Sequence, residues 1–258
     1  MNEGSSLNNR ALRRAVDWVT LAIVLVFLAV ANPLRAAEDL AEDWRTIETA
    51  HFRLHFDERN RDFAVRAAEL AEESHLQLVP IFGETAEAPI EIVILDDVDT
   101  ANGSAGAVPY NLITLYVMAP EAGGNLSDSD DWLRGLIIHE YIHILHMNRI
   151  SGLWAGYNAI FGRTAIPNQA LPRWFIEGLA TYGESRFTEG GRLRNNAYRM
   201  MLRMDSLSND FMGPENLSGY PVDWPGATGW YLYGSDFIDY VAHTRGPEGW
   251  IQVIEDIG

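Results

Sequence analysis

The amino-acid sequence predicts an α+β fold in which a small mixed sheet lobe precedes a mainly helical lobe. Segments with alternating or continuous apolar residues, which are typical of strands, occur between positions 49 and 118. Helical spacing of apolar residues dominates from position 132 onward. The chain has 258 residues and is 47% hydrophobic, so it can bury one substantial core or two lobes that meet at a cleft.

The first forty residues predict export. Three arginines between positions 10 and 14 precede an uncharged apolar run, residues 18–31, in the order typical of a secretory signal peptide. This run is shorter than the about 20 residues that a transmembrane helix needs. We therefore expect residues 1–37 to be a signal peptide, or an uncleaved signal anchor, with the start of a linker. Residues 38–258 are expected to form one domain in the periplasm or outside the cell.

Three strands and a helix are predicted in the first half of this domain. Residues 49–56 alternate, with Phe52, Leu54 and Phe56 on one side, as in a half-buried strand whose two histidines face solvent. The next predicted elements are a helix at residues 63–82, a buried strand at residues 89–95 and a further strand at residues 108–118.

A metal-binding motif, H-E-x-x-H, occupies residues 139–143 within an apolar helical pattern over residues 132–147. Positions i and i+4 lie one turn apart on the same face of a helix, so His139 and His143 can reach one metal ion. Glu140 stands beside them and is the candidate general base of a zinc hydrolase.

A third ligand is predicted 34 residues after His143. A catalytic zinc typically has three protein ligands and one open position, and Glu177 in a second helical run is the candidate. The run from Trp174 to Glu184 reads W-x-x-E-G-L-A-x-Y-x-E. It resembles the second zinc motif of the gluzincin metallopeptidases, especially the aminopeptidase N family and the peptidase MA-like domains of bacterial proteins. The 33 residues between His143 and Glu177 exceed the spacing in aminopeptidase N, which affects pocket shape more than zinc chemistry.

The resemblance implies a zincin, or thermolysin-like, fold in which an edge strand beside the H-E-x-x-H helix binds the substrate backbone. Residues 108–118 are expected to be that strand. In the aminopeptidase N family a tyrosine three residues before a glycine stabilises the oxyanion, and Tyr231 matches this position. Tyr233 is the alternative, and ordinary aromatic packing is a third interpretation of both.

Two further residues are predicted to lie near the metal ligands. Glu184 is a candidate partner for the second nitrogen of a ligand histidine, and His146 is expected in the core or behind the ligands. Residues 150–170 are apolar and contain three glycines. Core packing is expected for them, with a lid over the substrate or a membrane-touching loop as alternatives. Further helices are predicted at residues 192–207, around Tyr231 and at residues 250–257.

The resulting functional prediction is an exported zinc endopeptidase that acts on peptides or proteins. No carboxylate occurs between Gly103 and Met118, so the glutamate with which aminopeptidase N holds a free amino terminus has no counterpart there. The alternatives are a zinc-stabilised peptide-binding module of a larger, propeller-containing protein and a zinc hydrolase of non-peptide amides. Similar domains are often followed by further domains. The resemblance therefore implies a longer natural protein, in which this domain is followed by another.

Charge and composition exclude some partners. The net charge of −17 and the absence of lysine disfavour nucleic acid and anionic membranes, and the absence of cysteine excludes thiolate zinc ligands. Membrane contact is expected only through the N-terminal segment, if that segment stays uncleaved.

Overall fold

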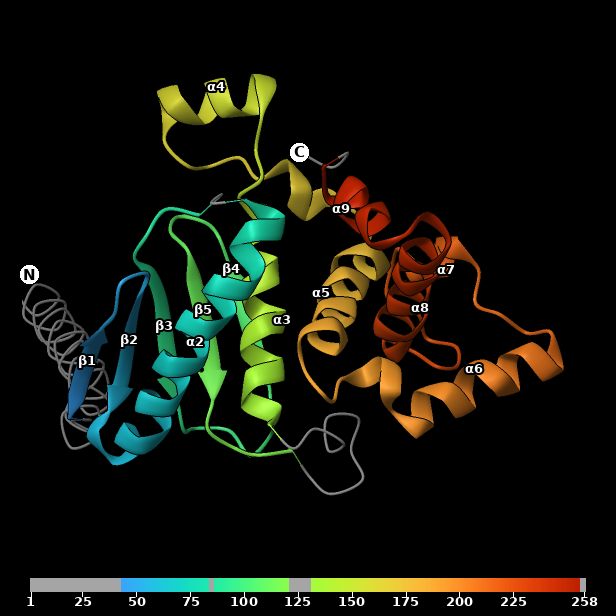
Figure 1. The fold of residues 1–258 in the computed structure, drawn as a ribbon, viewed down its shortest axis with the longest axis horizontal. Coiled ribbons are helices and arrows are strands. Elements are labelled where there is room, and N and C mark those ends of the chain that lie inside the picture. Colours follow the sequence, from blue (N-terminus) through green and yellow to red (C-terminus); the bar gives the residue numbers. More distant parts are fainter. Residues whose placement is uncertain (1–42, 84–85, 121–130, 256–258) are drawn as a thin grey trace, which may run out of the picture. The chain divides into compact units, whose positions relative to one another are not determined.

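The computed structural model describes residues 43–83, 86–120 and 131–255 (Figure 1). The predicted signal segment at residues 1–37 lies outside these ranges. Within them the fold is α+β, with one mixed five-stranded sheet followed by helices, which confirms the predicted fold class. No helix in the described ranges combines the length and the apolar character that crossing a membrane requires.

The sheet has the strand order β1-β2-β3-β5-β4. The strands are β1 (Trp44–Glu48), β2 (Phe52–Asp57), β3 (Ile90–Leu95), β4 (Gly103–Gly106) and β5 (Leu112–Tyr116). β2, β3 and β5 run parallel to one another, whereas β1 and β4 run antiparallel to their neighbours at the two edges. The sheet is therefore mixed, as predicted.

Alternating apolar residues give the sheet one buried face. In the observed register Leu54 lies beside Ile92, which in turn lies beside Ile113, and all three are fully buried. The other face is polar: Arg53 and His55 both bind Glu91, at 2.9 and 2.8 Å. The period-two pattern of residues 49–56 thus predicted the orientation of β2 correctly.

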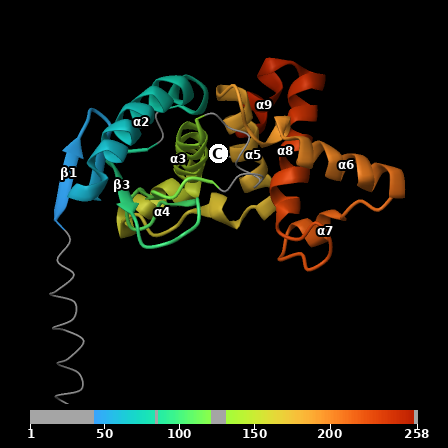
Figure 2. The same cartoon turned by 90° about the horizontal axis from the view of Figure 1, so that it is seen from below.

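Two long helices cover the buried face of the sheet, side by side (Figures 1 and 2). They are α2 (Arg61–Phe82) and α3 (Trp132–Met147), and the bounds of α3 are those predicted from the sequence. Asp131 begins α3 by accepting a hydrogen bond from the backbone N–H of Arg134. α3 is buried almost all round because it lies between α2 and the later helix α5, which explains why its sequence is apolar on every face.

The edge strand differs from the prediction. The strand at the edge beside α3 is β4, Gly103–Gly106, whereas the strand within residues 108–118 is β5, which lies inside the sheet between β3 and β4. β4 has the sequence Gly-Ser-Ala-Gly, so it carries no apolar alternation and resembles a loop in sequence. Pairing with β5, with Gly103 opposite Leu115 and Gly106 opposite Leu112, gives it its extended form.

The second half of the described chain is helical, as predicted. Its elements are the short 3₁₀ helices η2 (Pro167–Ala170) and η3 (Arg192–Arg194) and the helices α5 (Arg173–Phe187), α6 (Asn196–Ser208), α7 (Pro214–Leu217), α8 (Thr228–Arg245) and α9 (Pro247–Glu255). The predicted helix at residues 192–207 is divided at Asn195, whose side chain caps α6 by accepting from Ala197 N at 2.7 Å. α5 contacts α3 on one side and α8 on the other.

The contact between α5 and α8 depends on two glycines. A β-carbon at Gly178 would lie 2.4 Å from the backbone of Gly234, and one at Gly234 would lie 2.0 Å from the carbonyl oxygen of Trp174. Real β-carbons do not approach backbone atoms this closely, so only glycine allows the two helices to come so near. This contact fixes the position of α8, and with it Tyr231, relative to α5.

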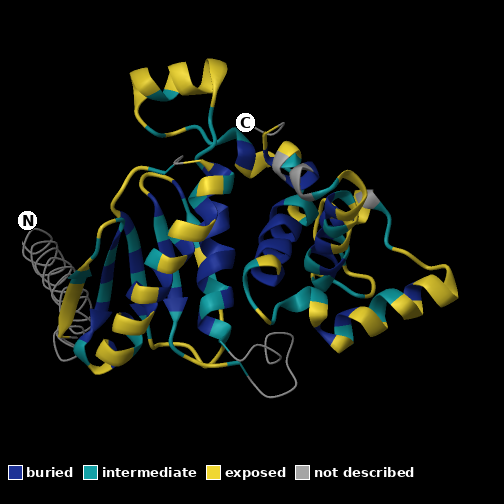
Figure 3. Ribbon diagram, in the orientation of Figure 1, coloured by how far each residue is buried: buried dark blue, intermediate teal, exposed yellow. Residues whose placement is uncertain are grey.

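The helical part of the apolar insertion is not in the core. It forms α4 (Gly152–Phe161), in which no residue is buried. In Figure 3 this helix is coloured almost entirely as exposed. The expectation of core packing is therefore wrong for this helix. Its apolar composition predicts burial, but no other described element covers its large side chains.

Candidate metal centre

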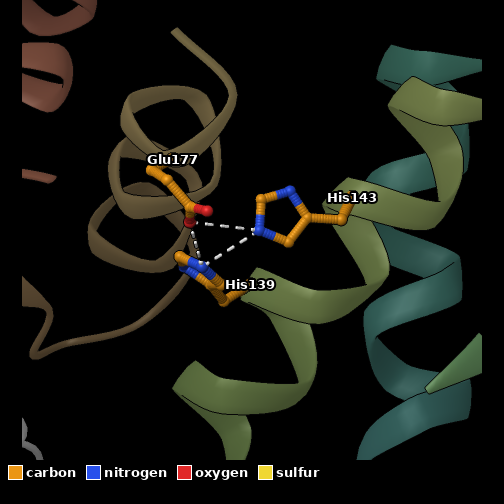
Figure 4. Close-up of side chains that lie close together, drawn as sticks. All are labelled: His139, His143 and Glu177. Carbon is orange, nitrogen blue, oxygen red and sulfur yellow. Dashed lines mark hydrogen bonds and ion pairs between the residues drawn. The ribbon is translucent and has the colours of Figure 1, made fainter. Parts of the chain in front are cut away.

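Three side chains from two helices point toward one another (Figure 4). His139 and His143 project from successive turns of α3, and their Nε2 atoms lie 3.2 Å apart. Glu177 projects from α5, and its Oε2 atom lies 3.4 Å from each of these nitrogens. All three residues are buried.

The spacing of these three atoms suits a tetrahedral metal ion. Zinc bonds to histidine nitrogen and carboxylate oxygen are about 2.0–2.1 Å long, so two ligand atoms of a tetrahedral ion lie about 3.3–3.4 Å apart. The measured separations of 3.2, 3.4 and 3.4 Å form a triangle of that size. His139, His143 and Glu177 therefore form a group that could hold a metal ion.

The charges at the group also favour a cation. Burial alone would raise the pKa of Glu177, but hydrogen bonds with His139 and His143 outweigh it and hold this pKa well below its usual range. Burial likewise opposes protonation of His143, yet the Glu177 carboxylate raises the pKa of this histidine. A buried carboxylate that stays ionised between two imidazoles is stabilised by positive charge, which a protonated imidazole, a bound metal ion or a neighbouring arginine can supply.

Glu140 lies beside the metal group but is not part of it. Only 5% of the residue is exposed, and burial raises the pKa of its carboxyl group, although His139 and His143 act in the opposite direction. The edge strand lies close to it: a β-carbon at Gly103 would be 3.0 Å from Cγ of Glu140. Glu140 is thus held between the metal group and β4.

The two tyrosines of α8 have different surroundings. Tyr231 lines the same cavity as His139 and Glu140, and its ring centroid is 6.1 Å from that of His139. Burial, followed by the negative charge of Glu177, raises the pKa of Tyr231 to about 12, so its hydroxyl stays protonated at neutral pH. Tyr233 does not line this cavity, and its hydroxyl donates to Asp205 on α6.

Arg192 is a site residue that the sequence reasoning missed. Its Nε donates to Glu184 at 2.5 Å, its Nη2 lies 3.0 Å from Nδ1 of His139, and its guanidinium is 4.5 Å from the ring centroid of Tyr231. Arg192 therefore connects a ligand histidine, a buried carboxylate and the candidate catalytic tyrosine. No local motif signals this role, because its partners are far apart along the chain.

Arg192 also bears on the predicted role of Glu184. Glu184 Oε2 lies 3.8 Å from Nδ1 of His139, with the Arg192 guanidinium closer to that nitrogen. An arginine can only donate, so in this arrangement Nδ1 of His139 accepts and the ring proton is on Nε2. A metal on Nε2 requires the proton on Nδ1 instead, and Glu184 is the carboxylate placed to accept it.

A second arginine contacts the group from the solvent side. Arg173 Nη1 lies 3.3 Å from Oε1 of Glu177, the oxygen that does not face the histidines. Its guanidinium also lies 5.1 Å from the ring of Trp230. Arg173 thereby holds one oxygen of Glu177 and leaves the other to point at His139 and His143.

The three residues of the metal group line one open cavity of about 580 Å³. Glu140, Arg173, Glu184, Arg192 and Tyr231 line it too. One wall is α3 and the other is formed by α5, η3 and α8, while Gly103, Ser104 and Ala105 of β4 form its rim. His146 does not line it. His146 is buried, contacts the ring of Phe175 and has neither ring nitrogen bonded within the described part of the chain, so it is a core residue and not a ligand.

Comparison of the chain with protein-family models gives no match, and comparison with curated proteins gives none either. The functional argument therefore rests on the two motifs and on the arrangement of their side chains.

Proposed function

We propose that this protein is a zinc-dependent peptidase of the gluzincin type, with a zincin fold, and that it acts mainly as an endopeptidase. The observation that carries the proposal is the triangle of His139, His143 and Glu177, with Glu140 and Tyr231 in the same cavity. A metal-binding role alone would not need a buried carboxylate and a protonated tyrosine beside the ligands.

Zinc is the metal that this donor set favours. Two imidazole nitrogens and one carboxylate oxygen are a common protein ligand set of catalytic zinc. When bound, zinc lowers the pKa of a water ligand to about 7 and polarises a carbonyl oxygen. All three residues line the cavity of about 580 Å³, so a metal held by them would be accessible from it.

Glu140 is suited to move a proton in both directions. It accepts the proton of the attacking water and then donates it to the leaving amine. Burial raises the pKa of Glu140, which makes it a stronger base than an exposed glutamate. Tyr231 donates a hydrogen bond to the oxyanion that develops on the substrate carbonyl. Arg192 positions Tyr231 and His139 through the contacts described above.

The edge strand β4 provides a place for the substrate backbone. Its outer edge pairs with no other strand of the described sheet, and it forms the rim of the cavity. An extended peptide can add to such an edge by backbone hydrogen bonds. The small side chains of Ser104 and Ala105 leave space for those of the peptide. No carboxylate lies on β4 or β5, so an anchor for a free amino terminus is missing there.

The proposal is tested by separating metal binding from turnover. Elemental analysis of the purified protein is expected to give one zinc per chain, and a His143→Ala, Glu177→Ala double variant is expected to lose it. His243→Ala, which changes an exposed histidine on α8, is the matched control and should keep the metal. Full zinc retention in the double variant would refute the ligand assignment.

Glu140→Gln is expected to keep zinc but to lower turnover of a peptide library by about 10²–10⁴-fold, because an amide fits in the same space and cannot accept the proton. If the parent protein binds zinc and peptides but cleaves none of the library, it is a binding module and not a peptidase.

A further inference from the structure

α4 presents a large apolar surface that no described element covers (Figures 1 and 3). Five large side chains in this ten-residue helix are exposed: Leu153 (83%), Trp154 (48%), Tyr157 (41%), Ile160 (76%) and Phe161 (63%). Isolated exposed apolar residues are common on protein surfaces, but a contiguous group of this kind marks an interaction site.

These side chains share one face of the helix. With 3.6 residues per turn they fall within an arc of about 120°. The rest of the helix surface carries Asn158 and the small residues Gly152, Ala155, Gly156 and Ala159. α4 therefore has one face of bulky aromatic and aliphatic side chains, the bulky face, and one of mostly small side chains, the flat face.

Polar contacts hold the base of α4 to the rest of the domain. Arg163, just after the helix, binds the side chains of Asn111 and Asn148. Within the insertion, Asn158 donates to the carbonyl oxygen of Ala165 at 2.8 Å and accepts from its N–H at 3.0 Å. The bulky face is thus presented from a fixed base.

The chemistry of this face points to a lipid bilayer. Residues 150–162 contain no Asp, Glu, Lys, Arg or His in a chain whose net charge is −17. Trp154 and Tyr157 are the residue types enriched at the boundary between headgroups and acyl chains. A ten-residue helix offers a face of about 15 Å by 10 Å, far below the roughly 800 Å² per partner of a stable protein dimer. A bilayer needs no matching partner surface.

We propose that α4 docks on the interfacial layer of an uncharged, zwitterionic bilayer, with its bulky face toward the acyl chains. The acidic charge of the chain opposes anionic lipid, so the binding is expected to be stronger on neutral lipid at low salt. The inference does not rest on the proposed peptidase function.

The absence of cysteine makes this directly testable in the full chain, because one introduced cysteine takes one label. Ile160→Cys on the bulky face is labelled with an environment-sensitive nitrobenzoxadiazole fluorophore. Ala155→Cys on the flat face and Leu207→Cys, an exposed position on α6, are the matched controls. With phosphatidylcholine vesicles we expect a blue shift and an intensity gain at position 160, a smaller change at 155 and none at 207.

Three results would overturn the proposal. If only the N-terminal apolar run adheres to the vesicles, the label at Ile160 does not respond. If all three labels respond equally, the protein adsorbs without using α4. If the label at Ile160 responds to protein concentration without lipid, α4 contacts a second copy of the chain. Leu153→Asn with Phe161→Asn should abolish the response, and phosphatidylglycerol vesicles should weaken it at low salt.

Discussion

Tyr231 and Tyr233 lie two positions apart on α8 and face different surroundings. Tyr231 is directed to the cavity that contains His139 and Glu140, whereas Tyr233 donates to the buried carboxylate of Asp205. The first therefore has access to a substrate, and the second holds α8 to α6. This difference makes the pair a built-in comparison between a catalytic and a structural tyrosine.

Tyr231→Phe is expected to lower kcat by about 10²–10³-fold, the usual effect of removing one oxyanion donor, with zinc content unchanged. Tyr233→Phe should leave kcat near that of the parent and lower the free energy of unfolding by about 1–3 kcal/mol, because Asp205 loses its buried donor. Steady-state kinetics and urea unfolding of both variants measure this. The reverse pattern would assign the oxyanion role to Tyr233.

His146 should make stability depend on pH. Burial, followed by the charge of His143, lowers the pKa of His146 from 6.5 to about 3. The unfolded state therefore binds a proton that the folded state rejects as the pH falls below 6.5. The lowered pKa of His146 therefore reduces the free energy of unfolding by about 2 kcal/mol between pH 7 and pH 5.

In metal-free protein, His146→Leu is expected to remove that part of the pH dependence. Urea unfolding at pH 7 and pH 5, with a chelator present, measures it. The parent protein, measured in the same way, is the reference. An unchanged slope in His146→Leu would show that His146 is not buried as a neutral ring.

At the scale of elements, the Gly178–Gly234 contact sets the position of Tyr231, the proposed oxyanion donor. Tyr231 is one turn before Gly234 on α8, and Glu177 is next to Gly178 on α5. The side chains of Tyr231 and Glu177 therefore project from the two helices close to the point where the helices touch. The spacing Tyr-x-x-Gly has a physical reason here: glycine allows the approach that brings the tyrosine over the ligands.

Gly234→Ala is expected to lower the free energy of unfolding by about 1–3 kcal/mol, as overpacking of a tight contact does. It should also lower kcat, because separation of α5 and α8 withdraws Tyr231. Gly156→Ala in exposed α4 is the control, since its β-carbon meets nothing within 4 Å and alanine favours the helix. Thermal unfolding and kinetics of both variants decide the point. Equal stability of the two would mean that the close contact carries no constraint.

Elements with a strong pattern were predictable from the sequence, and those with weak patterns were not. The bounds of α3 follow from its apolar run and its motif, and α5 follows from the second motif. β4 was missed because Gly-Ser-Ala-Gly has no periodicity, and pairing with β5 alone makes it a strand. α4 was misplaced because apolar residues predict burial, whereas here they face outward.

The same limit applies to the site. The spacing of His139 and His143 follows from a single helix turn, and Glu177 was found through the resemblance of the motif around it. Arg192 could not be found in this way, because its partners come from α3, α5 and α8 and meet only in the folded chain. Contacts that form only by tertiary packing have no characteristic spacing along the chain, so a single sequence does not reveal them.

At the scale of the whole molecule, the cavity and the uncharged β4 edge predict how the proposed peptidase treats the amino terminus of a substrate. Acetylation of the substrate amino terminus is expected to change kcat/KM by less than about tenfold, since no carboxylate on β4 or β5 can hold a free amine. The measurement compares one peptide with a free and an acetylated terminus. A larger loss, equivalent to more than about 1.4 kcal/mol of transition-state binding, would reveal an amine anchor elsewhere.

The ligand set is divided between the two halves of the domain: His139 and His143 belong to α3, which covers the sheet, and Glu177 belongs to α5, in the helical half. A bound ion would therefore cross-link the two halves, besides serving the proposed hydrolysis. An ion present at a hundred times its Kd adds about 2.7 kcal/mol to the free energy of unfolding. Metal depletion is then expected to raise the population of opened chains that other proteases can degrade, so the supply of the ion sets the lifetime of the protein together with its activity.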